Sequence, residues 1–287
     1  MTRAIRLGLA VVLVLRASTS LAQLTAAKDG PIVYGHHHIY SADVDAQKKF
    51  FVDTLGGTPI TVGTYTGAEI VRFPNVLVFV RRQAPTGGSR GTSVNHIGFS
   101  APDLRAVVSR IKANGFEMIT RSEVAADREV RDDIALAPAG GGNQIAFALA
   151  PDGLKVEFVE LKTQTIPIAM HHVHFFGPQN LDMQGWYVKT FGATARSGGA
   201  FPSAVLPGVA LNFSPSPTPV TGTQGRVIDH IGFEVKNLEA FTKTLQENGI
   251  KLERPYTKVD TLGTAIAFIR DPWGTYIELT EGLDKIN

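Results

Sequence analysis

The chain repeats itself, and this repeat is the strongest constraint on its fold. The segment that begins at His36 aligns with one that begins at His172, aromatic pair over aromatic pair and glycine over glycine. A second pair of segments, which begin "NHIGF" at residue 95 and "DHIGF" at residue 229, shares an Asn-Gly at the same later offset. All eight histidines lie in these four segments. Such self-similarity predicts one supersecondary unit copied along the chain.

Each copied unit is predicted to begin with a short strand, continue into a helix and end with three strands. After Asp103, apolar residues follow the i, i+3, i+4, i+7 spacing of an amphipathic helix, with Asp103 as N-cap and Asn114-Gly115 as the stop. Later runs such as "VLVFV" and "KVEFVEL" are typical of strands. The expected fold class is therefore α+β, with four βαβββ units.

The connections suggest how these units form domains. Breaker-rich segments at residues 84–93 and 214–225 occupy matching places in the two halves. We expect one domain of two units at residues 35–163 and a second at residues 168–284, after an N-terminal extension at residues 23–34. Pairing of units across the two halves is the alternative.

The first 22 residues have the pattern of a secretory signal peptide. Arg3 and Arg6 precede a nine-residue apolar run, and small residues follow up to Ala22. A membrane span needs ~20 apolar residues. We therefore expect cleavage after Ala22, no membrane partner afterwards, and a periplasmic or secreted bacterial protein.

Charge and cysteine content exclude several kinds of function. The signal segment holds three of the 28 basic side chains and none of the 26 acidic ones, so the mature chain is close to neutral. We expect no nucleic-acid partner for such a chain. The absence of cysteine excludes disulfides, thiolate metal sites and a cysteine nucleophile.

Histidines and glutamates recur as a set of metal donors. Side chains two residues apart share one face of a strand, which places His36 with His38 and His172 with His174. A glutamate lies at a matching position in the last strand of each half, where a buried carboxylate is costly unless paired or metal-bound. We expect 2-His-1-carboxylate sites for Fe(II), also usable by Mn(II) or Zn(II). The alternative is partly buried histidines satisfied by hydrogen bonds.

The unit starts "HHV", "NHIGF" and "DHIGF", the helix ends "FFVDTLGG" and "WYVKTFGA", and the stretch "DPWGTYIEL" resemble the vicinal oxygen chelate superfamily. This group includes glyoxalase I, fosfomycin and bleomycin resistance proteins and extradiol dioxygenases. The resemblance spans nearly the whole mature chain. It implies two tandem half-open barrels, each made of two βαβββ units around a metal. Carried over from the extradiol enzymes, it implies these two ligand sets: His172, His230 and Glu278, and His36, His96 and Glu157.

Two uncertainties in the site are open at this level. Crossed pairing of the units would regroup the ligands, so that one site would combine His96 and Glu157 with His172. His38 and His174, each two residues beyond a ligand, are expected to be catalytic, as a general base or as a fourth ligand. The alternative for both is a pocket histidine that only hydrogen-bonds a substrate.

Departures from the resembling enzymes bear on the reaction. The tyrosine that extradiol enzymes place ten residues before the glutamate is Phe268 here, and Phe147 in the first half. The additional glutamate ligand of glyoxalase I is also missing from its expected strand. We expect an exported metal-dependent enzyme, dioxygenase-like, for a small metal-chelating oxygenated substrate. The alternatives are a glyoxalase-like lyase or isomerase and a non-catalytic, bleomycin-resistance-like binding protein, and a homodimer is compatible with either.

Overall fold

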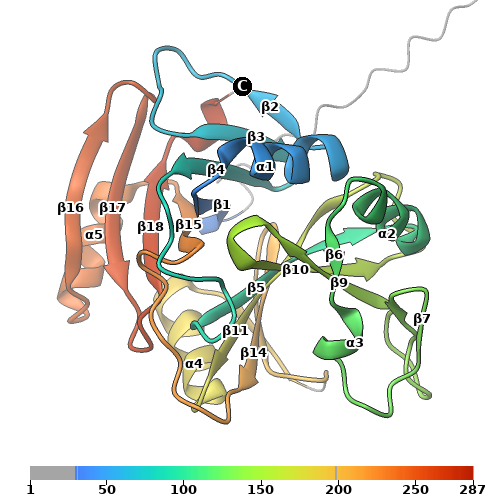
Figure 1. Ribbon diagram of the computed structural model, residues 1–287. Helices are drawn as coiled ribbons and strands as arrows, with labels where there is room; N and C mark the ends of the chain where they lie inside the picture. The colour runs from blue at the N-terminus through green and yellow to red at the C-terminus, as the bar shows by residue number, and fades with distance from the viewer. Residues whose placement is uncertain (1–29, 31, 198, 287) are drawn as a thin grey trace, which may run out of the picture.

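The protein is described here by a computed structural model that covers residues 30, 32–197 and 199–286. The signal peptide predicted at residues 1–22, and residues 23–29 and 31 of the extension predicted at residues 23–34, lie outside these described residues. Within them the chain forms the predicted α+β fold of four βαβββ units (Figure 1). The fold class expected from the sequence is confirmed.

The first unit comprises β1 (Ile32–Ser41), α1 (Val44–Lys48) continued by a π-helical turn (Lys49–Thr54), β2 (Thr58–Ile60), β3 (Glu69–Phe73) and β4 (Val76–Arg82). The second comprises β5 (Val94–Ala101), α2 (Leu104–Ala113), β6 (Glu117–Met118), α3 (Thr120–Glu123), β7 (Val130–Arg131), β8 (Ile134–Ala135), β9 (Ile145–Ala150), a 3-10 turn (Pro151–Gly153) and β10 (Leu154–Glu160). The third comprises β11 (Ala169–Gly177), α4 (Asn180–Phe191), β12 (Thr194–Arg196), β13 (Ser203–Leu206) and β14 (Val209–Pro215). The fourth comprises β15 (Ile228–Val235), α5 (Leu238–Glu247), β16 (Leu252–Val259), β17 (Thr264–Arg270), β18 (Tyr276–Glu281) and a 3-10 turn, η4 (Leu283–Lys285).

Helices α2 and α5 begin at the N-caps that their sequences provide. The Asp103 carboxylate accepts hydrogen bonds from the first-turn amides of α2, and the Asn237 side chain accepts one from Ala240 of α5. These caps satisfy amides that have no partner inside the helix. The apolar stripe of α2 is buried as its spacing predicted, which includes Val108 and Ile111.

The four units pair crosswise into two sheets. The first sheet has the strand order β16-β17-β18-β15-β1-β4-β3-β2 and combines units four and one. The second has the order β12-β13-β14-β11-β5-β10-β9-β8-β7, with β6 added beside β9, and combines units three and two. At the centre of each sheet two unit-opening strands meet antiparallel, β1 with β15 and β11 with β5. In Figure 1 the red and blue strands form one sheet, and the green and yellow strands belong to the other.

The crossed pairing corrects the predicted grouping of the units. Units inside residues 35–163 do not share a sheet, and neither do those inside residues 168–284. Sequence pattern could not decide this, because β5 and β15 carry the same His-Ile-Gly-Phe run and are equivalent partners for β1. The alternative pairing across the halves is the one that the structure adopts.

The two breaker-rich linkers lie side by side where the chain crosses between sheets. The amide of Thr86 donates to the carbonyl of Gly225 at 2.8 Å, and the amide of Ser93 donates to the carbonyl of Thr221 at 2.9 Å. Buried backbone groups need such partners. The linkers therefore stabilise the crossing rather than merely spanning it.

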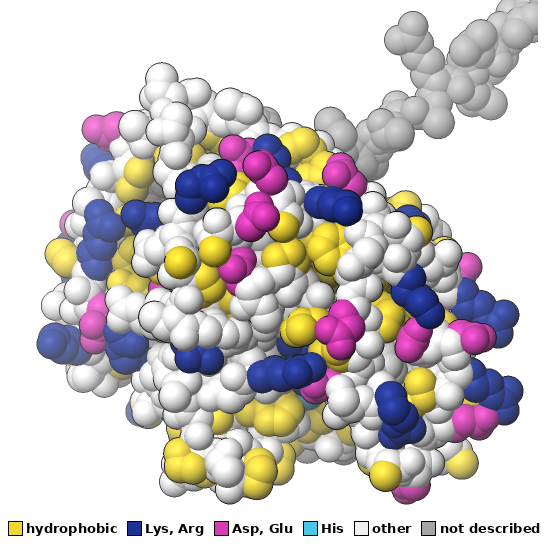
Figure 2. All heavy atoms as spheres, viewed as in Figure 1, with side chains coloured by type: hydrophobic (Ala, Val, Ile, Leu, Met, Phe, Trp, Pro, Cys, Tyr) yellow, Lys and Arg dark blue, Asp and Glu magenta, His cyan; other side chains and the backbone are white. Residues whose placement is uncertain are grey.

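The surface seen in Figure 2 carries interspersed charges. Lysine and arginine side chains alternate with aspartate and glutamate on this face, and apolar side chains show between them. Among the helices of the described residues, none is long and apolar enough to cross a membrane. The buried histidines and glutamates lie on the two sheets.

Candidate metal sites

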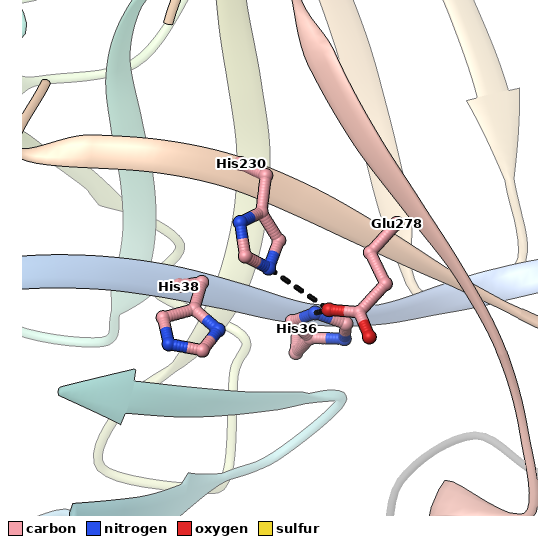
Figure 3. Close-up of side chains that lie close together, drawn as sticks. All are labelled: His36, His38, His230 and Glu278. Carbon is pink, nitrogen blue, oxygen red and sulfur yellow. Dashed lines mark hydrogen bonds and ion pairs between the residues drawn. The ribbon is translucent and has the colours of Figure 1, made fainter. Parts of the chain in front are cut away.

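Four side chains converge on the inner face of the first sheet, and we call them the sheet-1 site: His36, His38, His230 and Glu278. Oε2 of Glu278 accepts hydrogen bonds from Nε2 of His36 at 3.0 Å and from Nε2 of His230 at 2.8 Å (Figure 3). The ring of His38 lies beside that of His230, with centroids 4.4 Å apart. One donor atom from each of the four residues lies within 4.8 Å of the others.

The second sheet repeats this arrangement in the sheet-2 site: His96, Glu157, His172 and His174. Oε2 of Glu157 accepts hydrogen bonds from Nε2 of His96 at 2.8 Å and from Nε2 of His172 at 3.1 Å. The rings of His96 and His174 have centroids 4.7 Å apart. Here too the four donor atoms lie within 4.8 Å of one another.

Strand register explains why each cluster forms. His36 stands opposite Gly232 on the neighbouring strand, and Gly232 stands opposite Glu278 on the next. The glycine leaves space for the histidine ring, which a Cβ atom at that position would strike. His172, Gly98 and Glu157 repeat the relation in the second sheet. The glycine of each "HIGF" run thus lets the imidazole lie flat over the sheet.

The buried glutamates are kept ionised by their histidine partners. Burial alone would raise the pKa of Glu157, but His172 and His96 outweigh it and hold that pKa well below its usual range. The pKa of Glu278 is lowered in the same way by His230 and His36. Two carboxylates buried to this degree therefore remain acceptor groups at neutral pH.

The histidines of the two "HIGF" runs have different outer partners. Asp229 accepts a hydrogen bond from Nδ1 of His230 at 2.6 Å, whereas the side-chain amide oxygen of Asn95 lies 3.0 Å from Nδ1 of His96. Burial lowers the pKa of His230, but the bonds to Asp229 and Glu278 outweigh it and raise that pKa to about 9. For His96, burial prevails over the bond to Glu157 and lowers the pKa to about 3.

A buried lysine adds to this difference. Lys155 lies two residues before Glu157 on β10 and donates from Nζ to the side-chain oxygen of Asn95 at 2.8 Å. Tyr276 occupies the matching place in the first sheet, with its ring centroid 5.8 Å from that of His230. The sheet-1 site therefore has a carboxylate behind its "HIGF" histidine, and the sheet-2 site has an amide bound to a cation.

The donor sets fit a divalent metal ion. Among the described residues, Nδ1 of His36, Nε2 of His38 and Nδ1 of His174 are buried without a hydrogen-bond partner. His174 also forms a hydrogen bond through Nε2 with the hydroxyl of Ser214 at 2.8 Å, which leaves Nδ1 free. One nitrogen fixed by a hydrogen bond and the other free is the arrangement of a metal-binding histidine. Imidazole and carboxylate donors suit Fe(II), Mn(II) and Zn(II).

The two sites differ in the space beside them. The sheet-2 site opens into a cavity of about 610 Å³, to which Glu157 and His172 contribute. The sheet-1 site adjoins a space of only about 50 Å³. Ligand pockets commonly measure roughly 300–1,000 Å³. The second sheet therefore has room for a small organic molecule, and the first has room for a few waters.

The cavity wall of the second sheet comes from three parts of the chain. Small residues and one aromatic, Gly199, Ala200 and Phe201, lie on one side. The excursion between α2 and β9 supplies Arg128 and a glycine-rich turn, and β11 supplies His171. This excursion folds into α3, β7 and β8 and lines the cavity.

All eight predicted site residues fall in the two clusters, but the predicted ligand sets are regrouped. Glu278 lies with His230 and His36, and Glu157 lies with His96 and His172. The sets built on pairing within each half are therefore wrong, because the two units of each half lie in different sheets. The roles of His38 and His174 stay predictions.

Several residues around the sites were not predicted. Asn95 and Asp229 stand directly before the "HIGF" histidines, and Lys155 stands two residues before its glutamate. Their positions within the repeat were a readable signal, since a site histidine needs an outer partner. Nothing in the pattern marked Arg128 or Phe201, which come from segments without a counterpart of similar length or composition.

Comparison with known proteins places this geometry in a family context. The sequence profile of the Glyoxalase/Bleomycin resistance protein/Dioxygenase superfamily matches residues 33–158 and again residues 124–279. No curated protein matches the sequence. The crystal structure of glyoxalase I from Zea mays superposes with a TM-score of 0.66 at 17% identity, covering 88% of this chain and 94% of that one. A putative dioxygenase from Bacillus subtilis subsp. subtilis str. 168 gives a TM-score of 0.62 at 13% identity, covering 87% of this chain and 84% of that one.

Proposed function

We propose that this chain, which belongs to the Glyoxalase/Bleomycin resistance protein/Dioxygenase superfamily, is an exported metal-dependent enzyme. Its reaction takes place at the sheet-2 site. The substrate is a small molecule that presents two neighbouring oxygen atoms to a metal bound by His96, Glu157, His172 and His174. One observation carries the proposal: four buried donors converge on one point and adjoin a cavity of about 610 Å³.

The chain's own residues suit such a substrate. The bound ion would act as a Lewis acid toward the substrate oxygens. Glu157 and His172 line the cavity with polar atoms, while Phe201 and the glycine-rich wall offer apolar contact. Arg128 supplies a cation at the same wall. The polarity of the cavity thus favours a compact molecule with an oxygenated end and an apolar end.

The number of donors favours proton transfer over oxygenation. If all four side chains held the ion, a substrate bound through two oxygens would complete its coordination. The reaction is then glyoxalase-like, a lyase or isomerase reaction in which a proton leaves a carbon beside the bound oxygens. His171 lines the cavity without belonging to the donor set, and burial together with His172 lowers its pKa to about 4, so the ring has the neutral form that a proton acceptor requires but is only weakly basic.

A dioxygenase-like reaction is the second candidate, and the position of His174 favours it under one condition. If His174 acts as a base instead of a ligand, His96, His172 and Glu157 would hold the ion, and this three-donor set is one that would supply oxygenase chemistry with Fe(II). The hydrogen bond of His174 to Ser214 then orients the ring toward the substrate. The two candidate reactions therefore differ in the role of His174, which is a metal ligand in the first and a general base in the second.

Export is part of the proposal and rests on the signal-peptide pattern at residues 1–22. A periplasmic or secreted enzyme would meet substrates outside the cytoplasm. This favours small carbonyl or hydroxy compounds over adducts of cytoplasmic thiols.

A cobalt-substituted protein tests the site directly. We expect addition of acetohydroxamate, a two-oxygen chelator, to change the visible absorption of the bound Co(II) in the unmodified protein and in Glu278→Gln. Glu157→Gln should lose this change, because it removes a donor of the site that adjoins the cavity. A spectral change that survives Glu157→Gln and disappears in Glu278→Gln would overturn the proposal.

The reaction class is tested with a panel of small α-hydroxycarbonyl and catechol compounds. Consumption of dioxygen during turnover would indicate the oxygenative reaction. Turnover without dioxygen, with solvent deuterium incorporated at carbon, would indicate proton transfer. Absence of both, together with unchanged chelator binding, would support a binding protein instead.

A further inference from the structure

We infer that the sheet-1 site holds a structural metal ion that is closed to substrate, sealed by the C-terminal segment Gly282–Ile286. This inference goes beyond the proposed function, which uses only the sheet-2 site. It rests on three features of the first sheet: the apolar side chains that cover the site, the carboxylate that anchors the covering segment, and the hydrogen-bond partner of the site histidine His230.

Large apolar side chains fill the mouth of the first sheet. Tyr65, Leu262 and Leu283 line the remaining space of about 50 Å³. The comparable wall of the second sheet has Gly199, Ala200 and Gly141. Leu283 is 2% exposed and packs in one apolar cluster with Leu77, Phe79 and Ile286. A substrate of more than a few atoms cannot approach the donors without displacing this cluster.

A buried carboxylate anchors the sealing segment. Oε1 of Glu234 accepts hydrogen bonds from the amides of Gly282 at 2.5 Å and Leu283 at 3.1 Å. Its Oε2 accepts one from the hydroxyl of Thr280 at 2.8 Å. Ser100 occupies the matching position in the second sheet and bonds Gln164 instead. Glu234 thus serves the closed first sheet and has no acidic counterpart in the open one.

The space left inside the seal is small, and buried polar atoms without partners face it. Nε2 of His38 and Oγ1 of Thr264 are buried there without hydrogen-bond partners among the described residues. Such atoms lose free energy unless an ion or water satisfies them. An ion bound by the four donors, with one or two waters, satisfies this space and leaves no place for a substrate.

The outer partners favour retention of the ion. Asp229 places a full negative charge behind His230, while Asn95 places only an amide behind His96 and is itself bound to Lys155. An outer carboxylate increases the donor strength of a histidine, and such partners change metal affinity about 10–100-fold. The sheet-1 ion should therefore leave more slowly than the sheet-2 ion for two independent reasons, burial and charge.

Release of metal to a chelator tests this inference. The mature chain is loaded with Zn(II), transferred to excess EDTA, and the remaining zinc is measured over time by elemental analysis. We expect two phases at least 10-fold apart in rate. Glu157→Gln should retain only the slow ion and Glu278→Gln only the fast one, and Glu278→Gln should lower the melting temperature more.

Two further variants keep the test decisive if Glu278→Gln does not fold. Leu283→Ala leaves every donor in place and should accelerate the slow phase at least 10-fold without changing the fast phase. Asp229→Asn copies the residue of the second sheet and should accelerate the slow phase about 10–100-fold, with Asn95→Asp as the reciprocal control. Equal release rates for both ions, an unchanged slow phase in Leu283→Ala, or a slow ion lost in Glu157→Gln would overturn the inference. These measurements need no substrate, so they can fail while the proposed enzyme stands, and the reverse.

Discussion

The hydroxyl of Tyr187 donates a hydrogen bond to Oδ2 of Asp271 at 3.0 Å. Tyr187 lies on α4, which packs on the second sheet, whereas Asp271 lies in the turn between β17 and β18 of the first. Both side chains are buried. The bond therefore joins the two sheets at a point where the other half of the chain has Phe51 and Ala150 at the matching positions.

This pair should show strong coupling in a double-mutant cycle. Tyr187→Phe and Asp271→Ala each leave buried polar groups without a partner, which we expect to cost about 1–3 kcal/mol of unfolding free energy. The double variant copies the apolar pair of the first half and should cost less than the sum of the two. Urea unfolding at pH 7 measures all four proteins. Additive losses would show that the bond does not link the sheets energetically.

Asp271 should also make stability depend on pH. Burial raises its pKa to about 6, against opposing hydrogen bonds from Thr275 and Tyr187. A raised pKa means that the folded chain prefers the protonated form, so this group's stabilising contribution is complete below about pH 4 and is lost as the pH rises through 6. Asp271→Asn keeps the acceptor oxygen but does not titrate. Relative to the unmodified protein, it should gain roughly 2 kcal/mol between pH 4 and pH 7, as urea unfolding at each pH would reveal; a constant difference would contradict the assignment.

Metal stoichiometry should reveal which residues share a site. We expect one to two divalent ions per mature chain and loss of about one in Glu278→Ala. Because His36 lies with Glu278, His36→Ala combined with Glu278→Ala should lose no more than either alone. His36→Ala combined with Glu157→Ala should lose both ions. The reverse result, from elemental analysis, would support the ligand sets within each half.

His174 should behave as a ligand in the favoured reaction. His174→Gln is then expected to weaken metal binding at the sheet-2 site at least as much as loss of an outer partner, roughly 10–100-fold. His38→Gln is the matched control and should leave that site unchanged. If metal binding is kept but turnover falls ~10²–10⁴-fold, His174 is a general base and the dioxygenase-like candidate gains. Unchanged metal binding and turnover would leave it without either role.

Export predicts a defined start of the mature protein. Mass spectrometry of protein from the periplasm or medium of the native host should find Gln23, or a residue close to it, as the first residue. An intact Met1 in a soluble cytoplasmic fraction would contradict the signal peptide.

The sequence predicted local structure well because the same strand and helix patterns recur in its four units. Alternation along the strands placed His36 and His38 on one face, and Asp103 marked the start of α2. Every candidate donor was found in this way. The partners of those donors were not, because β5 and β15 offer the same edge and only long-range packing selects between them.

The difference between the open sheet-2 site and the closed sheet-1 site was harder to predict from the sequence. The donors themselves are duplicated, so the difference lies in residues whose meaning depends on location in space. In the sequence nothing marks Leu283, because its role depends on the hydrogen bond by which Glu234 positions its turn over the sheet-1 site. Gly199 and Gly141 line the cavity because two segments far apart in the sequence meet beside the sheet-2 site.

The crossed pairing also orders the assembly of the molecule. All strands of the second sheet lie between residues 94 and 215, an uninterrupted central stretch, whereas the first sheet joins β1 near the beginning of the chain to β18 near its end. Contacts between distant residues form late because the loop that they close costs the most entropy. The second sheet can therefore complete its donor set while β1 still lacks its partner β15, and the first sheet is complete only when β18 has joined β15. A chain shortened before β18 would keep the open site and lose the sealed one.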